Sequence, residues 1–308
     1  MTDLLSAEIH CHNIYSNFRN KSCIMPFDCS VTIEEQLNKV LEKKIDVLFV
    51  TNHNTLDGYH QILEYQQNHK KYHDIKIYPG EEITIDNKGH VLAYGINKEV
   101  KPGMSLEQTL DEIKRQNGVS CAAHPFAVSN GIREKALLCD LIESFNSNNV
   151  DIFSNTIAND FSKKNNMFAT AGSDSHIAST IGRCINTVES ENNLDSIIQA
   201  MRHDKFKIDR ADYATKLELF KHAHYILFSS RNLVLSYFSE HHPRIHRVAK
   251  LVLNYYITNP DRRLWHALGV FGLYLTKRAS KKVNIKGYDA HVFENRTWRT
   301  LISMSLIP

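Results

Sequence analysis

Short apolar runs alternate with helix-like segments from the start of this chain to about residue 190. The run Asp46–Thr51 (DVLFVT) predicts a buried strand, and Thr32–Lys44 before it predicts a capped amphipathic helix. Repeated units of this kind form parallel sheets or barrels, whose functional side chains gather at the carboxyl ends of the strands. We therefore expect an α/β domain over residues 1–209.

Six or seven such units are expected before the pattern changes. A further helix is predicted over Met104–Gln116, with Ser105 as its cap. The remaining expected strands are Ala7–His10, Ile75–Tyr78, Ile83–Ile85, Val91–Ile96, Val119–Ala123, Leu141–Phe145 and Phe168–Ala171.

Most of these strands lead into a side chain that commonly binds metal ions. Because side chains alternate along a strand, His10 and His12 at the end of the first run point to the same side, at a spacing that suits two ligands of one ion. Strand ends in a barrel converge on one rim, so the pattern predicts a single metal cluster. The other candidates are His53, Glu81, His90, His124, Asp174 and His176.

The order of these motifs resembles the polymerase and histidinol phosphatase (PHP) superfamily of metal-dependent phosphoesterases. The matching segments are His10–His12, Asn52–Gly58, the strand end at Glu81, Gly89–Ile96, His124–Pro125 and Gly172–His176, followed by Ile181–Arg183. The resemblance implies a distorted (β/α)7 barrel that binds two or three divalent ions at the carboxyl ends of its strands.

The resemblance also implies ligands for each ion: His10, His12 and Asp174 for the first, His90 and His124 for the second, Glu81 as a bridge between these two, and His53 with His176 for a third. Mixed imidazole and carboxylate ligands favour Mn, Fe or Zn, while Mg stays possible as a family metal. A metal-bridged hydroxide would attack phosphorus, with Glu81, His124, Asp174 and His176 as the catalytic set.

Two positions depart from the family pattern. Asn17 and Asn52 stand where the family usually has Asp, and a neutral amide is a weaker ligand than a carboxylate. Asp28 or Asp57 could replace the lost charge, although the sequence does not place either of them. The leading hypothesis is a phosphatase or phosphodiesterase acting on a nucleotide, an oligonucleotide end or a small phosphorylated metabolite. The alternative is a catalytically weakened module that binds a phosphorylated ligand or a partner.

Further side chains carry more specific expectations. Arg19, Arg133 and Arg183 are candidates for binding the substrate phosphate, because guanidinium groups match phosphate oxygens. Alternation directs Cys11 into the packing layer, and Glu8 is expected to accept a hydrogen bond from an imidazole, with Glu82 exposed.

An amidohydrolase with a similar barrel is a third hypothesis, but the bridging Lys that such enzymes usually have is absent from these motifs.

The region 210–308 differs from what precedes it. Residues 1–210 carry 22 basic and 28 acidic side chains, a net charge of −6, whereas 211–308 carry 15 basic and 6 acidic, a net charge of +9. Helical periodicity predicts helices over Ala214–Phe228, Asn232–Phe238, Pro243–Tyr256 and Pro260–Thr276, and no element after Lys277. Their aromatic side chains are expected to form the core of a small bundle. Contact of the basic face with nucleic acid, a membrane or a partner stays open.

No apolar run reaches the roughly 20 residues that span a bilayer. The six cysteines lack the dense spacing of a secreted disulfide scaffold, and the first residues lack a signal-peptide pattern. A cytoplasmic location is the expectation.

Overall fold

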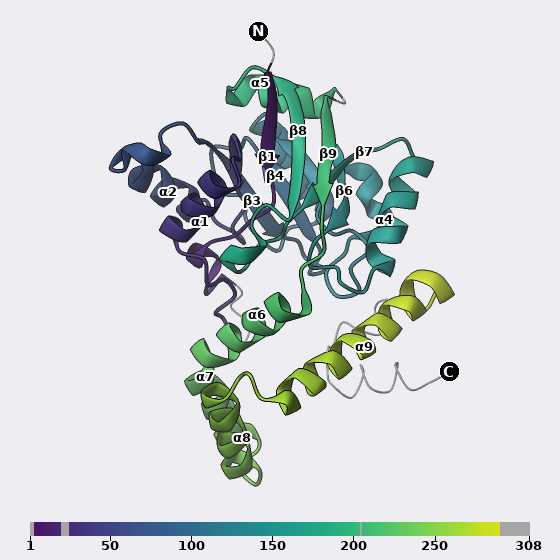
Figure 1. Cartoon of the computed structure of the whole chain (residues 1–308). Helices are drawn as coiled ribbons and strands as arrows, with labels where there is room; N and C mark the ends of the chain where they lie inside the picture. The colour runs from purple at the N-terminus through teal and green to yellow at the C-terminus, as the bar shows by residue number, and fades with distance from the viewer. Residues whose placement is uncertain (1–2, 20–24, 204, 290–308) are drawn as a thin grey trace.

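The computed structural model describes residues 3–19, 25–203 and 205–289, and its centre is a curled sheet of nine strands (Figure 1). The strands lie in the order β7-β6-β5-β4-β3-β2-β1-β8-β9, and β9 packs next to β7, so the sheet is nearly closed into a barrel. The strands are β1 (Asp3–Glu8), β2 (Val47–Val50), β3 (Lys76–Thr84), β4 (His90–Tyr94), β5 (Val119–Ala122), β6 (Leu141–Asn146), β7 (Phe168–Gly172), β8 (Cys184–Ser190) and β9 (Phe206–Ala211).

The expected distorted barrel is confirmed, but its sheet has nine strands and is mixed, whereas seven strands in a parallel arrangement were expected. β1, β2 and β3 pair in parallel, as do β5, β6 and β7, but β4 is antiparallel to both its neighbours, and β8 is antiparallel to β1 and β9. The segment between β3 and β4 is too short for a crossover helix, so the two strands form a hairpin. Thr84 at the end of β3 therefore pairs with His90 at the start of β4. This pairing places His90 at the same rim as the carboxyl ends of the parallel strands.

Helices α1 to α4 cover the outer face of the sheet, whereas α5 packs against its interior layer. Capping boxes at Thr32 and Ser105 begin α1 and α3, as expected for their sequences. One apolar layer lies between the sheet and α1 and α2, a second lies beneath α3, and a third fills the barrel interior. The helices are α1 (Ile33–Glu42), α2 (Asp57–Gln67), α3 (Leu106–Arg115), α4 (Phe153–Lys164), α5 (Leu194–Arg202), α6 (Lys216–Ser229), α7 (Arg231–His241), α8 (His246–Thr258) and α9 (Arg263–Lys286).

β3 is one continuous strand where two short strands were expected, and its register decides which side chains enter the barrel. Ile77 and Ile83 belong to the layers outside the sheet, whereas Tyr78 packs against the interior layer. Because side chains alternate along a strand, even-numbered positions of β3 face inward and odd-numbered positions face outward. The short apolar runs around Pro79 and Gly80 concealed this continuity in the sequence.

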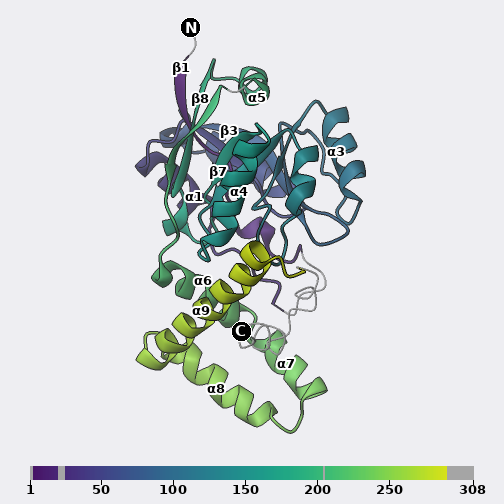
Figure 2. The ribbon, with the colours of Figure 1, turned by 90° about the vertical axis from the view of Figure 1, so that its right-hand side faces the viewer.

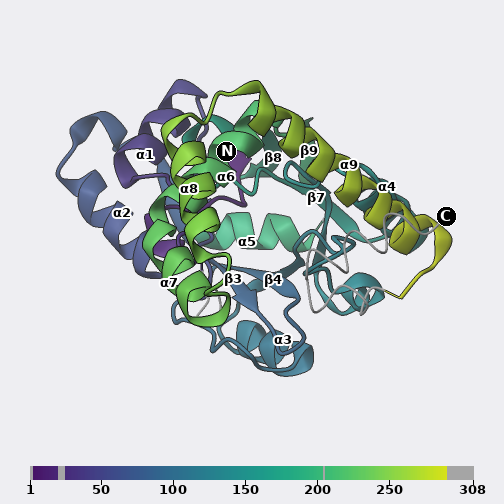
Figure 3. The same cartoon turned by 90° about the horizontal axis from the view of Figure 1, so that it is seen from below.

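After β9 the chain forms a helical arm, residues 216–286. The arm lies at the end of the barrel where the carboxyl ends of the parallel strands meet (Figure 2). The helices α7 and α8 form a hairpin that projects away from the barrel, and α9 returns to pack against α4 (Figure 3). The helix α9 continues to Lys286, although no element was predicted after Lys277. The rest of that tail, 290–308, lies outside the described residues. Within the described part of the chain, no helix is long and apolar enough to cross a bilayer.

Candidate metal centre

Six imidazoles and the Asp174 carboxylate meet at the rim of the barrel. The ring centroid of His12 lies 4.6 Å from that of His53 and 4.3 Å from that of His176. The ring of His10 is 5.3 Å from that of His12, and Nε2 of both imidazoles lies within 3.4 Å of Asp174 Oδ1. The structure thus brings together seven of the eight side chains expected to bind metal. The imidazoles of this cluster are those of His10, His12, His53, His90, His124 and His176.

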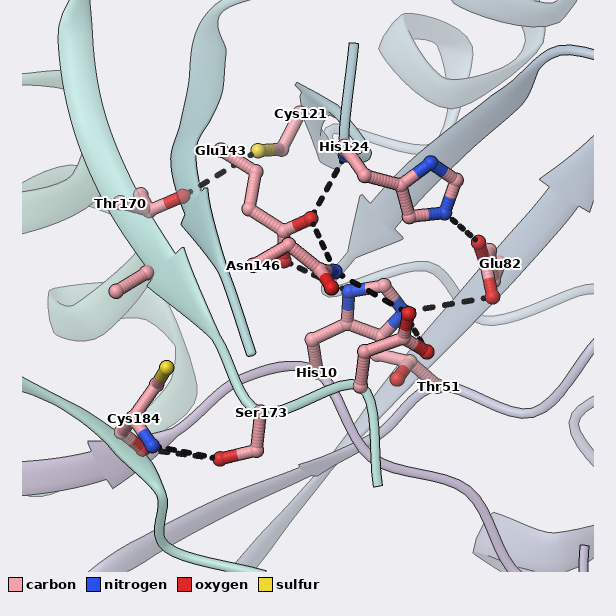
Figure 4. Close-up of polar contacts among 12 residues, drawn as sticks. His10, Thr51, Glu82, Cys121, His124, Glu143, Asn146, Thr170, Ser173 and Cys184 are labelled. Atoms are coloured by element: carbon pink, nitrogen blue, oxygen red, sulfur yellow. Dashed lines mark hydrogen bonds and ion pairs between the residues drawn. The ribbon is translucent and has the colours of Figure 1, made fainter. Parts of the chain in front are cut away.

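The eighth expected ligand, Glu81, is not in the cluster, and its neighbour Glu82 lies among the imidazoles instead. Figure 4 shows the contacts of Glu82 with His10 and His124. Oε2 of Glu82 lies 3.3 Å from His10 Nε2, and its Oε1 lies 3.0 Å from His124 Nε2. The same carboxylate lies within 3.2 Å of His12, His53 and His90. The expected exposure of Glu82 was therefore wrong, since the residue is 1% exposed.

The register of β3 explains this correction. Glu81 is an odd-numbered position and points outward, where its Oε2 accepts a hydrogen bond from the backbone N–H of Val100 at 2.9 Å. Burial raises the pKa of Glu81 to about 8. Glu82 is an even-numbered position and points inward, toward the strand ends. The sequence signal that could have distinguished the two is the alternation of β3, provided that its continuity had been recognised.

Glu143, which no motif had indicated, orients His10. Its Oε1 lies 2.7 Å from Nδ1 of His10, and its Oε2 accepts the backbone N–H of His124 at 2.7 Å. A hydrogen bond at Nδ1 leaves Nε2 of His10 to face the cluster. The close approach requires glycine at Gly172, because a Cβ there would lie 1.6 Å from Glu143 Oε1. An acidic residue inside the buried strand β6 was the available signal.

Glu8 has a different role from the expected one. It accepts hydrogen bonds from the backbone N–H groups of His10, at 3.3 Å, and Gly182, at 2.9 Å, and not from an imidazole. Burial raises its pKa to about 7. Cys11 is fully buried in the layer outside the sheet, as alternation predicted. The five cysteines that the structure describes are all buried and unpaired.

Asp28 supplies a carboxylate beside the third expected ligand pair. Its Oδ2 lies 2.9 Å from His176 Nε2 and 3.3 Å from His53 Nε2. Asn17 supports this arrangement, because its Oδ1 accepts the backbone N–H groups of Asp28 and Cys29 at 2.7 and 2.9 Å. Asp28 thus brings back a charge near the place where the amide of Asn17 had removed one.

Two other polar residues near this corner have structural roles. The side chain of Asn52 is hydrogen-bonded to Asn13, and Asp57 pairs with Arg19 outside the cluster.

The helical arm reaches the cluster through His222 of α6, whose Nε2 donates to the Asp28 carbonyl at 2.6 Å and whose ring lies 5.0 Å from that of His176.

The cluster fits divalent cations. Three groups of its side chains place one ligand atom each within 4.8 Å of one another: His10, His12, Glu82 and Asp174; His53, Glu82 and His90; and His12, His53 and His176. Nε2 of His10, Nε2 of His12 and Oε2 of Glu82 are buried without a hydrogen-bond partner, although buried polar atoms are normally paired. Imidazoles and carboxylates that converge in this way, with lone pairs unused, are the ligands of transition metals.

The two central carboxylates stay ionised although they are buried. Burial by itself would raise the pKa of Glu82, but the neighbouring imidazoles of His53, His90 and His10 hold it well below its usual range. Burial would likewise raise the pKa of Asp174, but the imidazole of His10 holds that pKa well below its usual range. Both carboxylates are therefore in the form that binds cations.

The three arginines expected to bind phosphate have separate positions. Arg183 donates to both oxygens of Glu218 on α6, each at 2.9 Å, and so joins the barrel to the helical arm. Arg19 is paired with Asp57, as stated above. Arg133 donates to Asn284 at 3.2 Å, and one of its buried nitrogens has no hydrogen-bond partner among the described residues. Of the three, Arg133 alone has no recorded carboxylate partner within the described part of the chain.

A cavity of about 490 Å³ opens beside the cluster, between the loops of the barrel and α9. Its wall includes His124 and Asp174 of the cluster, and Thr276 of α9. None of the described residues that line it is Lys or Arg. The remaining polar wall consists mainly of uncharged side chains, among them Ser129, Asn130, Asn148 and Asn149.

Several known proteins are similar to this chain. The family model described as PHP-associated matches residues 153–206. An uncharacterized protein of Methanocaldococcus jannaschii is 30% identical over 158 residues, which are 50% of this chain and 89% of that protein. The structure of PsfC from Pseudomonas syringae PB-5123 is similar, with a TM-score of 0.52 at 15% identity, over 75% of this chain and 99% of that one.

A lesion-specific endonuclease from Pyrococcus furiosus also aligns, with a TM-score of 0.49 at 15% identity over 67% of this chain and 58% of that one. The motif order, the nearly closed barrel with its buried imidazole cluster and the family model lead to one assignment. The chain has a barrel of the PHP type and contains a PHP-associated region at residues 153–206.

Proposed function

We propose that this protein hydrolyses a phosphate ester of a small molecule, with two or three divalent ions bound by the imidazole cluster. One observation carries the proposal: buried ligand atoms of His10, His12 and Glu82 converge without hydrogen-bond partners, directly beside a cavity of about 490 Å³. We assign Mn, Fe or Zn as the ions because imidazoles outnumber carboxylates among the ligands.

The side chains of the cluster and around it would have distinct roles in the proposed hydrolysis. Ions bound here would supply the positive charge that stabilises a phosphoryl group and lowers the pKa of water. Glu82 would be shared between ligand sets, because its two oxygens face different imidazoles. Glu143 fixes the ring of His10, and Asn146 donates to Asp174 Oδ2 at 3.2 Å, so two ligands are held in place before substrate arrives.

The cavity indicates the class of substrate. A volume of about 490 Å³ suits a molecule of mononucleotide or sugar-phosphate size. Its amide-rich wall suits a neutral, hydroxylated leaving group, because Asn130, Asn148 and Asn149 offer donors and acceptors without charge. Phosphate charge would then be met by the ions. Arg133 does not line this cavity and would contribute only to a substrate that extends beyond it. We favour a small phosphorylated metabolite or nucleotide over a long nucleic acid.

The test uses purified protein that has been stripped with a chelator and reloaded separately with Mn²⁺, Fe²⁺, Zn²⁺ or Mg²⁺. Hydrolysis is measured for p-nitrophenyl phosphate, its bis ester and a nucleoside bisphosphate, and metal content is measured on the same samples. We expect turnover that is lost in His124→Ala and Asp174→Ala. Asp57→Asn is the control, since its carboxylate lies outside the cluster and is more than half exposed.

Full metal occupancy without turnover of any ester would contradict the proposal and favour the alternative of a ligand-binding module. Turnover that persists at the wild-type rate in both cluster variants would also contradict it. Cleavage of amides in place of esters would indicate an amidohydrolase.

A further inference from the structure

The four helices of the arm do not pack around a closed hydrophobic core. A cavity of about 580 Å³ lies between its four helices, lined by side chains such as Phe220, Leu227, Val252 and Leu268. In α8 no residue is buried, and in α6 and α7 only Glu218 and Val234 are. The expected compact bundle with aromatic side chains in its core is therefore not what forms.

Large apolar side chains remain exposed along the arm. Among the described residues, fifteen of them are exposed in 212–289, against eight in the whole of the preceding part of the chain. Soluble monomers seldom expose contiguous apolar surface on this scale without a partner. The exposed side chains with the clearest helical spacing are Val248, Leu251, Val252 and Tyr255 on α8, and Leu264, Leu268, Phe271 and Tyr274 on α9.

The helix α9 shows two different halves. Its second half docks on the barrel, where Ala279 and Val283 are buried and Ser280 donates to Asp151 at 2.6 Å. Its first half, 263–276, contacts the barrel little and is apolar on several sides, with no charged residue between Arg263 and Lys277. A helix that is apolar nearly all round requires an apolar environment on its free sides.

The charge of the arm indicates what kind of partner covers its apolar side chains. The residues 212–289 contain 13 basic and 5 acidic side chains, and Asp261 is the only acid between Glu240 and Asp289. Exposed Arg247 and Lys250 flank the apolar stripe of α8, and Arg263 precedes that of α9. A nucleic acid would match the charge but offers no hydrocarbon for the leucines. A second copy of the chain would bring the same basic side chains together across a two-fold axis.

An anionic lipid surface satisfies both requirements, because it offers hydrocarbon beneath a layer of negative charge. Amphipathic helices that are rich in Arg, Lys, Leu and aromatic residues lie in that interface without crossing the bilayer. We propose that the helical arm binds anionic membrane surfaces through the apolar stripes of α8 and of the first half of α9. This proposal is independent of the proposed hydrolysis.

The test is co-sedimentation of the full chain with vesicles. We expect binding to vesicles of equal parts phosphatidylcholine and phosphatidylglycerol, and much weaker binding to phosphatidylcholine alone. Leu251→Ser and Leu268→Ser should each weaken binding about tenfold, because each removes a leucine from hydrocarbon. Leu138→Ser is the matched control, since Leu138 on the barrel is 54% exposed and Leu268 is 53% exposed.

Several outcomes would overturn the proposal: no binding to anionic vesicles, or binding that both arm variants leave unchanged. Light scattering that shows a dimer which Leu251→Ser dissociates would favour a second copy as the occupant. Tight binding of a short DNA duplex, lost in Arg247→Gln but not in Leu268→Ser, would favour nucleic acid. Because the substituted leucines are exposed, circular dichroism and metal content should match the wild type in every leucine variant.

Discussion

The neighbours Glu81 and Glu82 offer the sharpest test of the candidate metal centre. Glu82 lies within 3.3 Å of nitrogens from five imidazoles, whereas Glu81 contacts the backbone of Val100 on the other side of the strand. We predict that Glu82→Gln loses bound metal and that Glu81→Gln keeps it. The two variants change the same chemical group at adjacent positions, so each is the control for the other.

The expected magnitude follows from the charge that is removed. Two unit charges about 4 Å apart interact by about 4 kcal/mol at an effective dielectric constant of about 20, and a divalent ion interacts more strongly. Part of this is regained because an amide oxygen still offers a dipole. A loss of about 4 kcal/mol corresponds to roughly a thousandfold weaker metal binding. Glu81, with a pKa of about 8, is mostly protonated at neutral pH, and glutamine resembles that form closely.

The assay is isothermal titration of chelator-stripped protein with Mn²⁺, together with metal analysis after dialysis. Circular dichroism of the stripped proteins checks that both variants fold. Metal binding that survives in Glu82→Gln, or that disappears in Glu81→Gln while the fold persists, would refute the assignment of the inward position to Glu82.

Three further predictions concern the surroundings of the cluster. Asp28→Asn should reduce the number of bound ions by one, measured as metal per chain, because Asp28 faces His176 in the third ligand group; an unchanged count would contradict this. Glu218→Gln should lower the free energy of unfolding by about 1 kcal/mol, because it weakens the pair with Arg183.

Although burial raises the pKa of Glu218, the hydrogen bond from Arg183 brings it below its usual value. The stabilisation should therefore be present above about pH 5 and fade as the pH falls below about 4, which denaturant melts at several pH values would check. Thr276→Trp should narrow the cavity and raise the KM of a nucleotide substrate about tenfold, with p-nitrophenyl phosphate affected less. Equal effects on both substrates would show that α9 does not form a wall of the substrate cavity.

Much of the candidate site could be predicted from local patterns. The six imidazoles and Asp174 each follow or begin an apolar run, and the convergence of strand ends in a barrel needs only that repetition. The helices of the arm were also predictable, because periodicity is a local property, and the four predicted segments correspond to α6, α7, α8 and α9.

Other features of the site depend on contacts between distant parts of the chain, which local sequence patterns do not show. The choice between Glu81 and Glu82 depends on the parity of β3, and parity depends on pairing with β2 and β4 across the sheet. Glu143 and Asp28 belong to no recognised motif, and they reach the cluster from a strand and a loop far away in the sequence. The pairing of Arg183 with Glu218 likewise required the position of α6.

Composition and periodicity are local properties of the chain, so they were enough to predict the kinds of side chain in the candidate site and the order in which the strands supply them. Three other properties follow only from the packing of the folded chain: which carboxylate lies among the imidazoles, which of the three candidate arginines has no carboxylate partner among the described residues, and which apolar stripes of the described arm are exposed. Charge pairing and burial depend on neighbours in space. A shift of one residue in strand register, or a different docking of a helix, would change these neighbours for many side chains at once.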